Sequence, residues 1–434
     1  MESHRSWVEQ TVGGRVKAWT RPASGGSRET WFVEIEDADG ASREVVLRVE
    51  GDGSFSGTEI SLAREAVAYK ALERAGIPVP RILAMNEDGT AVVMTRAEGD
   101  SDLAAFSAES QSAIMDDFVD RLAELHAVPV DRMELPGFER PGTPQEHATL
   151  DLDRWIRLSA GVRAFDPLAA YAGGWLRSHA PAQVERTCFV QGDTGPGNFV
   201  AVDAKVSAFV DMEFSHIGDP MDDLAWLLYR SASIGRDGAE LLQRYARRSG
   251  LSVVEASVAF YGLAVQYRCV VTTSLAVARG GGARGLAPYI LQTERYLATV
   301  AAQLRTLVGV GEETVDVPTF IATARTPWYD NVIQSLRDAV RALPADDVRD
   351  ETRNTQIYVQ YLRAYDSVGA QIDELDRLDL SAVFGPTVVA DAEAIVAEAA
   401  QAGSAGDEAV LRGLLRRQAR RRGLWAALLD RPRR

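Results

Sequence analysis

Three segments near the start of the chain alternate apolar with polar residues, as strands with one buried face do. They are residues 15–22 (RVKAWTRP), 30–37 (TWFVEIED) and 43–50 (REVVLRVE). Residues 58–76 instead repeat their apolar positions at helical spacing and end at a glycine, which predicts a helix. Residues 77–99 contain two more apolar runs around an NEDG turn. Strands, one helix and two further strands predict a compact α+β unit of about one hundred residues.

The pattern becomes helical in the middle of the chain. Residues 107–128 carry a helical apolar stripe, and two short β-runs within residues 186–214 then interrupt the helices as a hairpin. Helices resume where Asp219 is predicted to act as N-cap, with Pro220 in the first turn. Residues 308–319 are interpreted as a linker into a wholly helical segment. The pattern thus predicts three parts, residues 1–98, 99–311 and 312–434, of which the last is a helical domain of unknown role.

Length and charge narrow the classes of function. A chain of 434 residues exceeds the size at which single cores usually stop growing, so two or three domains are expected. The formal net charge of −15 argues against a nucleic-acid partner, which normally meets a basic face. It suits a small cationic ligand without requiring one. Because Lys17, Lys70 and Lys205 are the only lysines, a phosphate-binding cation must be one of these or an arginine.

No feature of the sequence indicates secretion or membrane insertion. Cys188 and Cys269 are too few for a disulfide framework and lack the spacing of metal ligands. The first residues lack a signal-peptide core, and no apolar run reaches the roughly 18–20 residues that span a bilayer. We therefore expect a cytoplasmic protein with no membrane partner. Residues 411–434, rich in arginine and leucine, are interpreted as a solvated helix packing on its own domain, with membrane or partner contact as the alternative.

The segment QGDTGPGN (191–198) carries the clearest chemical signal. Asp193 and Asn198 stand five residues apart around glycines and a proline, and Asp211 follows the next strand. Phosphoryl transfer needs a base at the acceptor hydroxyl, a divalent metal and cations on the phosphates. We assign Asp193 as the catalytic base, and Asn198 and Asp211 as ligands of Mg²⁺, which prefers hard oxygens. Alone, Asp193 and Asn198 would be read as turn residues, but their partners favour the catalytic interpretation.

Upstream residues supply candidates for nucleotide binding. Arg48 at the end of the third strand and Glu65 on the next helix fit a strand cation held by a helix carboxylate and aimed at phosphates. Gly25 and Gly26, in the loop between the first two strands, would let the backbone close over a nucleotide. The segment MTRAEG (94–99) is predicted to contact adenine through its backbone, with Thr95 and Ala97 as the contact residues.

Several other polar residues are left outside the catalytic set. Asp219, Asp222 and Asp223 are interpreted as carboxylates that stabilise the start of a helix. The histidines lack ligand spacing, so His126 and His216 are interpreted as structural or surface residues.

In their order and spacing, these motifs resemble the aminoglycoside phosphotransferase and choline kinase-like superfamily of small-molecule kinases. The branch most similar is the bacterial one related to kinase-like domains fused to acyl-CoA dehydrogenases. The resemblance rests on four segments and covers about residues 10–310: VQGDTGPGNFV (190–200), VDMEF (210–214), IGDPMDDLAWLL (217–228) and AREAVAYKALERAGIPVPRIL (63–83). It implies an α+β, protein-kinase-like two-lobed fold, here with an additional all-helical C-terminal domain. Residues 1–98 would then form the nucleotide-binding lobe and residues 99–311 the catalytic and acceptor-binding lobe.

One position departs from the family pattern, which usually has histidine where this chain has Gln191. The family's histidine braces the catalytic loop through a hydrogen bond to the backbone beside the metal aspartate. Glutamine has an NH₂ donor of comparable reach, so Gln191 is expected to preserve this brace near Asp211.

The resemblance implies transfer of the γ-phosphate of ATP or GTP to a small-molecule hydroxyl, with Mg²⁺. An aminoglycoside-like polycation suits the acidic chain. The relatives associated with acyl-CoA dehydrogenases suggest a hydroxyacyl thioester or another catabolic acid, which would need arginine at the acceptor site. The alternative from another class is a pseudokinase, a nucleotide-binding or protein-interaction module in which Gln191 marks lost catalysis. The sequence leaves the oligomeric state open.

Overall fold

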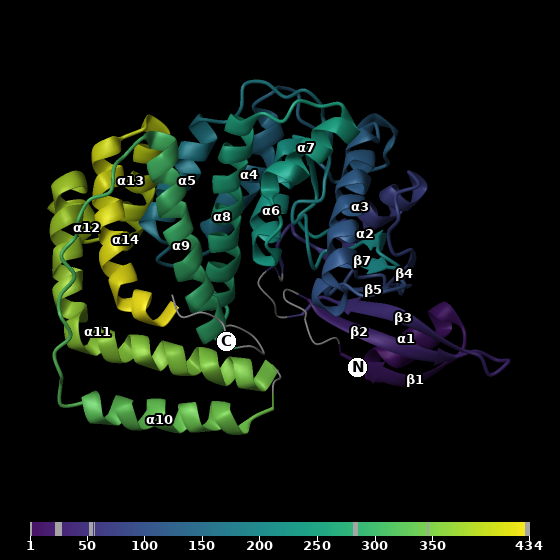
Figure 1. Ribbon diagram of the computed structural model, residues 1–434, viewed down its shortest axis with the longest axis horizontal. Helices are drawn as coiled ribbons and strands as arrows, with labels where there is room; N and C mark the ends of the chain where they lie inside the picture. Colours follow the sequence, from purple (N-terminus) through teal and green to yellow (C-terminus); the bar gives the residue numbers. More distant parts are fainter. Residues whose placement is uncertain are drawn as a thin grey trace. The chain divides into compact units, whose positions relative to one another are not determined.

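The computed structural model describes residues 2–21, 28–51, 55, 57–280, 285–344 and 347–429 (Figure 1). The chain divides into two compact units. The first unit contains Met1–Asp151 and Pro181–Gly262, and the second contains Leu152–Ala180 and Leu263–Arg434. The expected boundaries at residues 98 and 311 fall inside these units and stay a prediction. Among the described residues, no helix combines the length and apolar character needed to cross a membrane.

The first unit opens with a helix and a five-stranded antiparallel sheet. Its first elements are α1 (Glu2–Val12), β1 (Arg15–Thr20), β2 (Glu29–Glu36), β3 (Ser42–Val49), α2 (Leu62–Arg74), β4 (Ile82–Met85) and β5 (Ala91–Thr95). The strand order is β1-β2-β3-β5-β4, with every neighbouring pair antiparallel. The prediction of three strands, a helix and two strands is confirmed, and α1 is an addition to it.

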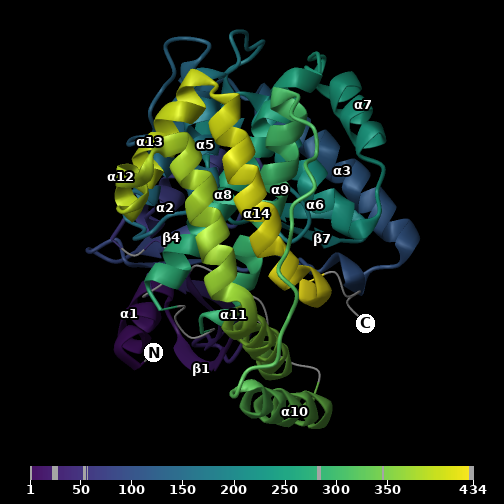
Figure 2. The same cartoon turned by 90° about the vertical axis from the view of Figure 1, so that its left-hand side faces the viewer.

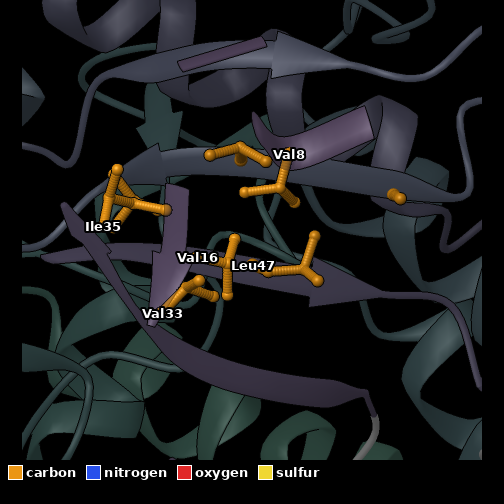
Figure 3. Packing of buried hydrophobic residues seen from close by; sticks show 8 residues of the cluster. Val8, Val16, Val33, Ile35 and Leu47 are labelled. Atoms are coloured by element: carbon orange, nitrogen blue, oxygen red, sulfur yellow. The ribbon is translucent and has the colours of Figure 1, made fainter. Parts of the chain in front are cut away.

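The alternation within these strands builds a core against α1. Val33 and Ile35 of β2 and Leu47 of β3 are fully buried, and Val8 of α1 packs with them (Figure 3). Each such side chain contributes roughly 1.5–3 kcal/mol on burial. Since successive side chains of a strand point to opposite faces, Leu47 in the core turns the neighbouring Arg48 away from it.

The middle of the chain adds mostly helices. These elements are η1 (Leu103–Ala105), α3 (Ala108–Ala127), η2 (Val130–Arg132), α4 (Glu146–Ser159), β6 (Cys188–Val190), β7 (Phe199–Val202), β8 (Lys205–Phe209), β9 (His216–Gly218), α6 (Pro220–Ser231), η3 (Ala232–Ile234), α7 (Gly238–Ser249) and α8 (Glu255–Ala278). The expected hairpin is present as β7 and β8, whereas β6 pairs with β9. The Asp219 carboxylate caps α6 by accepting the N–H of Met221 at 2.9 Å, and Pro220 is the first helical residue, as predicted.

The second unit is helical. Its remaining elements are α5 (Pro167–Ser178), α9 (Ala287–Val308), α10 (Thr326–Ala342), α11 (Asp347–Phe384), α12 (Pro386–Val389), α13 (Ala392–Ala405) and α14 (Glu408–Leu429). Helices α5 and α13 meet backbone to backbone, because Gly174 lies against the carbonyl of Ala400 and Gly403 against that of Tyr171. Neither glycine has room for a Cβ, so larger residues would force these helices apart.

The arginines of α14 are paired with carboxylates, whereas the sequence predicted that they would be solvated. Helix α14 lies alongside α11 (Figure 2), and its residues Leu411, Leu414, Leu415 and Leu424 are buried, as expected. Arg420 and Arg421 donate to the two carboxylate oxygens of Asp376 at 3.0 and 2.9 Å, and Arg416 donates to Asp379 at 3.2 Å. Asp376 and Arg420 are buried. Carboxylates three residues apart share one face of α11, so they meet a row of arginines there rather than water.

Candidate active site

Glu65 is the centre of a buried ion cluster in the first unit. It lies in the first turn of α2 and is 1% exposed, and its two oxygens contact Arg48 and Arg28 respectively. Burial lowers the pKa of Arg48, but the carboxylates of Glu65 and Asp211 outweigh this and raise it overall. The structure thus brings Arg48 and Glu65 together, while their role in holding phosphates stays a prediction.

Arg28 is a second cation of this cluster that sequence reasoning missed. It directly precedes β2, is buried, and donates to the carbonyl of Ile60 at 3.0 Å. Its guanidinium also lies 3.5 Å from Glu213 and 3.6 Å from Glu50. Burial, followed by the nearby charge of Asp211, raises the pKa of Glu213 to about 8. Periodicity gives no signal for Arg28, because its partners lie on distant segments.

Asp211 lies directly beside this cluster. Its Oδ1 is 3.5 Å from Nη2 of Arg48, and its side chain is about one-third exposed. Its φ of 62° is in the left-handed region, which costs energy for a residue other than glycine. The hydroxyl of Tyr69 on α2 accepts the Asp211 N–H at 2.9 Å and holds this conformation. The strand-to-loop junction therefore presents a carboxylate next to the cation on β3.

Asp193 and Asn198 are joined within the loop between β6 and β7. The Asn198 Nδ2 donates to the Asp193 carboxylate at 2.6 Å and to its backbone carbonyl at 2.7 Å. Because Nδ2 is engaged in this way, the side-chain oxygen Oδ1 of Asn198 is the atom of this amide that remains for a metal. Burial raises the pKa of Asp193, and Arg230 opposes that shift.

Gln191 ties together the two segments that carry the candidate metal ligands. Its Nε2 donates to the carbonyl of Asn198 at 3.1 Å and to that of Val210, next to Asp211, at 2.8 Å. Its side chain is fully buried. The hydrogen bond expected of the loop brace is therefore present, and its effect on catalysis stays a prediction.

Asp223 organises the loop, which the sequence interpretation missed. Asp223 does lie in the first turn of α6, but its buried carboxylate accepts from the backbone N–H groups of Gln191 and Gly192, at 2.8 and 2.9 Å, and from the Thr194 hydroxyl. The Nε2 of His126 lies 3.0 Å from the same carboxylate. Four donors on one buried carboxylate fix the loop that carries Asp193.

Arg230 is the third residue that sequence reasoning missed. It lies in the last turn of α6, and its Nε donates to Oδ1 of Asp193 at 2.8 Å while Nη2 contacts Oδ2. Its Nη1 donates to the carbonyl of Pro196 at 3.0 Å. Arg230 follows Asp223 by seven residues and so shares its helix face, which is the signal that could have found it.

Four residues expected to contact the nucleotide receive no test from the structure. Gly25 and Gly26 lie outside the described residues. Thr95 ends β5, where its N–H donates to the carbonyl of Arg81 at 2.9 Å and its hydroxyl accepts the Arg81 N–H at 2.9 Å. Ala97 is half-buried in the segment that follows. Adenine contact by Thr95 and Ala97 stays a prediction.

Two sets of side chains have donor atoms suited to a cation. Asn198 and Asp211 supply hard oxygens, which fit Mg²⁺. The buried trio of Asp151, His216 and Asp222 has ligand atoms within 4.8 Å of one another, with His216 Nε2 3.3 Å from Asp222. The trio offers an imidazole and two carboxylates, which are ligand types that divalent metals accept. Asn198 lies in the same loop as Asp193, and Asp211 lies beside Arg48.

Comparison with known proteins gives the chain a context. The model of the phosphotransferase enzyme family (APH) matches residues 18–261. Acyl-CoA dehydrogenase family member 10 of Mus musculus is 28% identical over 215 residues, which are 46% of this chain and 19% of that protein. Family member 11 of Rattus norvegicus is 28% identical over 220 residues, 48% of this chain and 27% of that protein. The match thus spans about a quarter or less of these two relatives.

The fold of this chain resembles that of solved phosphotransferase structures. A ternary complex of a thermostable mutant of aminoglycoside phosphotransferase APH(4)-Ia with AMP-PNP and hygromycin B is 16% identical and covers 72% of this chain and 100% of that one, with a TM-score of 0.52. At this identity the likeness concerns the fold alone. The expected kinase-like α+β fold with a largely helical C-terminal part is confirmed.

Proposed function

Because the chain belongs to the phosphotransferase enzyme family, we propose that it transfers the γ-phosphate of ATP or GTP to a hydroxyl of a small molecule. The observation that carries this proposal is the grouping of Asp193, Asn198 and Asp211 beside Arg48. The solved relative that holds AMP-PNP and hygromycin B supports a nucleotide and a small-molecule acceptor as the two substrates. We place the protein in the cytoplasm, with no nucleic-acid or membrane partner.

Each residue has a distinct part in the proposed reaction. The acceptor hydroxyl oxygen bonds to the γ-phosphorus as the bond from that phosphorus to the β-phosphate oxygen breaks, and ADP or GDP leaves. Asp193 receives the hydroxyl proton. Arg48, oriented by Glu65, holds the nucleotide phosphates, and Gln191 keeps the two metal-ligand segments in register. Asn198 and Asp211 would hold Mg²⁺, which neutralises charge on the phosphate oxygens.

The acceptor class follows from the relatives in two ways. The aminoglycoside phosphotransferases suggest an aminoglycoside-like polycation. The acyl-CoA dehydrogenase family members suggest a hydroxyacyl thioester or another catabolic acid. The acidic net charge favours the first and a cation at the acceptor site favours the second.

A pseudokinase is the second candidate, and one observation favours it. Both oxygens of Asp193 accept from Arg230, and the guanidinium opposes the rise in pKa that burial gives to the carboxylate that the transferase needs as a base. On this alternative the chain binds a nucleotide or a protein without turnover.

The test is release of ADP from ATP, or of GDP from GTP, by the full chain with Mg²⁺, across hygromycin B, hydroxy acids and hydroxyacyl thioesters. Acceptor-dependent release of the nucleoside diphosphate, with a phosphorylated product by mass spectrometry and its loss in Asp193→Asn, supports the transferase. Nucleotide-dependent thermal stabilisation without any product supports the pseudokinase.

A further inference from the structure

Arg230 immobilises the carboxylate that the proposed reaction needs. Oδ1 of Asp193 accepts from Nε of Arg230, and Oδ2 accepts from Nη2 of Arg230 and from Asn198. An arginine fork matched to a carboxylate is among the stronger polar contacts in proteins. A general base accepts the proton of the acceptor hydroxyl on one of these oxygens, so the guanidinium of Arg230 and the acceptor compete for the space around the carboxylate.

The loop is shaped to accommodate Arg230. A Cβ at Gly195 would lie 2.9 Å from Cβ and 3.1 Å from Cδ of Arg230, so the arginine stem lies directly against the glycine. The backbone carbonyl of Pro196 accepts from the third guanidinium nitrogen, and the ring of Trp226 lies 5.8 Å from the guanidinium carbon. The position of Arg230 is therefore fixed by several contacts with the loop and with Trp226.

The two partners differ in their access to solvent. The side chain of Arg230 is 26% exposed and that of Asp193 is 12% exposed. A ligand arriving from solvent therefore meets the guanidinium before the carboxylate is fully accessible. An anionic group can replace the carboxylate as the ion-pair partner of the guanidinium, whereas a neutral group accepts only a weaker hydrogen bond and a cationic group is repelled.

We propose that Arg230 is a specificity-determining residue that recognises a carboxylate or phosphate group of the acceptor. When that anion pairs with the guanidinium, Asp193 is released and accepts from the acceptor hydroxyl. The hydroxyl and the anionic group of the acceptor must therefore be separated by about the width of a guanidinium group. This inference rests on the proposed phosphotransfer function. It selects an anionic hydroxy compound over an aminoglycoside, because Arg230 repels an ammonium group at the same position.

The experiment compares matched acceptors with the full chain, Mg²⁺ and ATP. The pairs are 3-hydroxybutyrate with its amide and glycerol 3-phosphate with glycerol, and kanamycin is the cationic probe. We expect kcat/KM for each anion to exceed that of its neutral partner by about tenfold or more, a difference of about 1.4 kcal/mol. The carboxylate and phosphate pairs separate the two sources of negative charge.

Arg230→Gln should reduce the preference for the anion over its neutral partner, through a change in the turnover of both compounds. Turnover of the anion falls because its partner is gone, and turnover of the neutral compound rises because Asp193 is no longer engaged. Arg230→Lys should restore part of the preference through its charge. The matched control is Arg244→Gln, since Arg244 makes the same two-pronged contact with Asp120, at 2.8 and 2.6 Å, in the same unit. An unchanged preference in Arg230→Gln, or a wild-type preference for kanamycin, overturns the inference.

A binding measurement separates failure of the inference from failure of the proposed function. Calorimetry compares 3-hydroxybutyrate and its amide on protein loaded with a non-hydrolysable ATP analogue. If the acid binds more tightly than the amide, if Arg230→Gln abolishes this difference, and if no turnover occurs, the anion site is upheld and the transferase is rejected. Equal or undetectable binding of both compounds, again without turnover, overturns the anion site as well.

Discussion

The side-chain amide of Gln191 lies 2.8 Å from the carbonyl oxygen of Val210 and so connects the catalytic loop to the segment bearing Asp211. Gln191→His should change turnover little, because an imidazole can donate the same hydrogen bond. Gln191→Ala should destabilise the fold by about 1–3 kcal/mol, since it leaves buried carbonyls without a donor. Urea unfolding and steady-state kinetics check both variants. A kinase activity that is absent in the native chain and present in Gln191→His would establish the pseudokinase instead.

Asp223 carries the second prediction. Asp223→Asn should lower the free energy of unfolding by about 2–4 kcal/mol and abolish turnover, because four donors lose a buried charged acceptor. The control is Asp120→Asn, whose ion pair with Arg244 is about one-third exposed and should cost at most about 1 kcal/mol. Equal losses in the two variants would contradict the organising role of Asp223.

The third prediction separates metal binding from proton transfer. Asp211→Ala should remove the rise in melting temperature produced by Mg²⁺ and ATP together, because it removes a metal ligand. Asp193→Asn should keep that rise and lower kcat by about 10²–10⁴-fold, as loss of a general base does. Thermal-shift and kinetic measurements on both variants suffice. An undiminished metal-dependent shift in Asp211→Ala would reject Asp211 as a ligand.

Glu294 on α9 predicts a pH dependence of stability. Burial, and then the charge of Asp166, raises its pKa to about 7, and its Oε2 is buried without a hydrogen-bond partner among the described residues. The folded chain thus keeps a proton that the unfolded chain releases near pH 4.5. This stabilisation is complete at low pH and is lost as pH rises through about 7, by up to about 3 kcal/mol. Glu294→Gln should flatten the difference in urea unfolding between pH 5 and pH 8, and an unchanged slope would exclude Glu294 as its source.

The contact between α11 and α14 gives the fifth prediction. Asp376→Asn should destabilise the fold by about 3–5 kcal/mol, because it leaves the buried charge of Arg420 with an incomplete set of partners. Glu374→Gln is the control on the same helix, since its pair with Arg377 is about half exposed. Similar unfolding midpoints for the two variants would show that the buried ion pairs contribute no more than surface ones.

Periodicity predicted the sheet, helix α2 and the hairpin because each depends on which face of a short segment is buried. The pair of Arg48 and Glu65 could be predicted as well, because a known arrangement fixes a strand cation relative to the next helix. Periodicity reports burial but not the identity of a polar partner. Asp223 looked like any acidic residue at a helix start, although its carboxylate accepts from the loop around Gln191.

The remaining site residues were hidden by distance along the chain. Arg230 meets Asp193 across 37 residues, and Arg28 meets Glu65 across the same separation. Nothing in the local sequence of Arg28 distinguishes it from the many surface arginines of this lysine-poor chain. The spacing of Arg230 from Asp223 becomes a signal only once the role of Asp223 is known. The row of arginines on α14 was misread for the same reason, since its partners Asp376 and Asp379 lie on another helix.

The close contact between α5 and α13 has a consequence for synthesis on the ribosome. Helix α5 is almost entirely buried in the folded second unit, yet roughly 200 residues separate it from the helix that receives Gly174. At translation rates of about 5–20 residues per second, α5 waits roughly 10–40 s for α13 to emerge. During that interval its apolar surface, including Leu168 and Leu176, lacks its final neighbour and is open to chaperones.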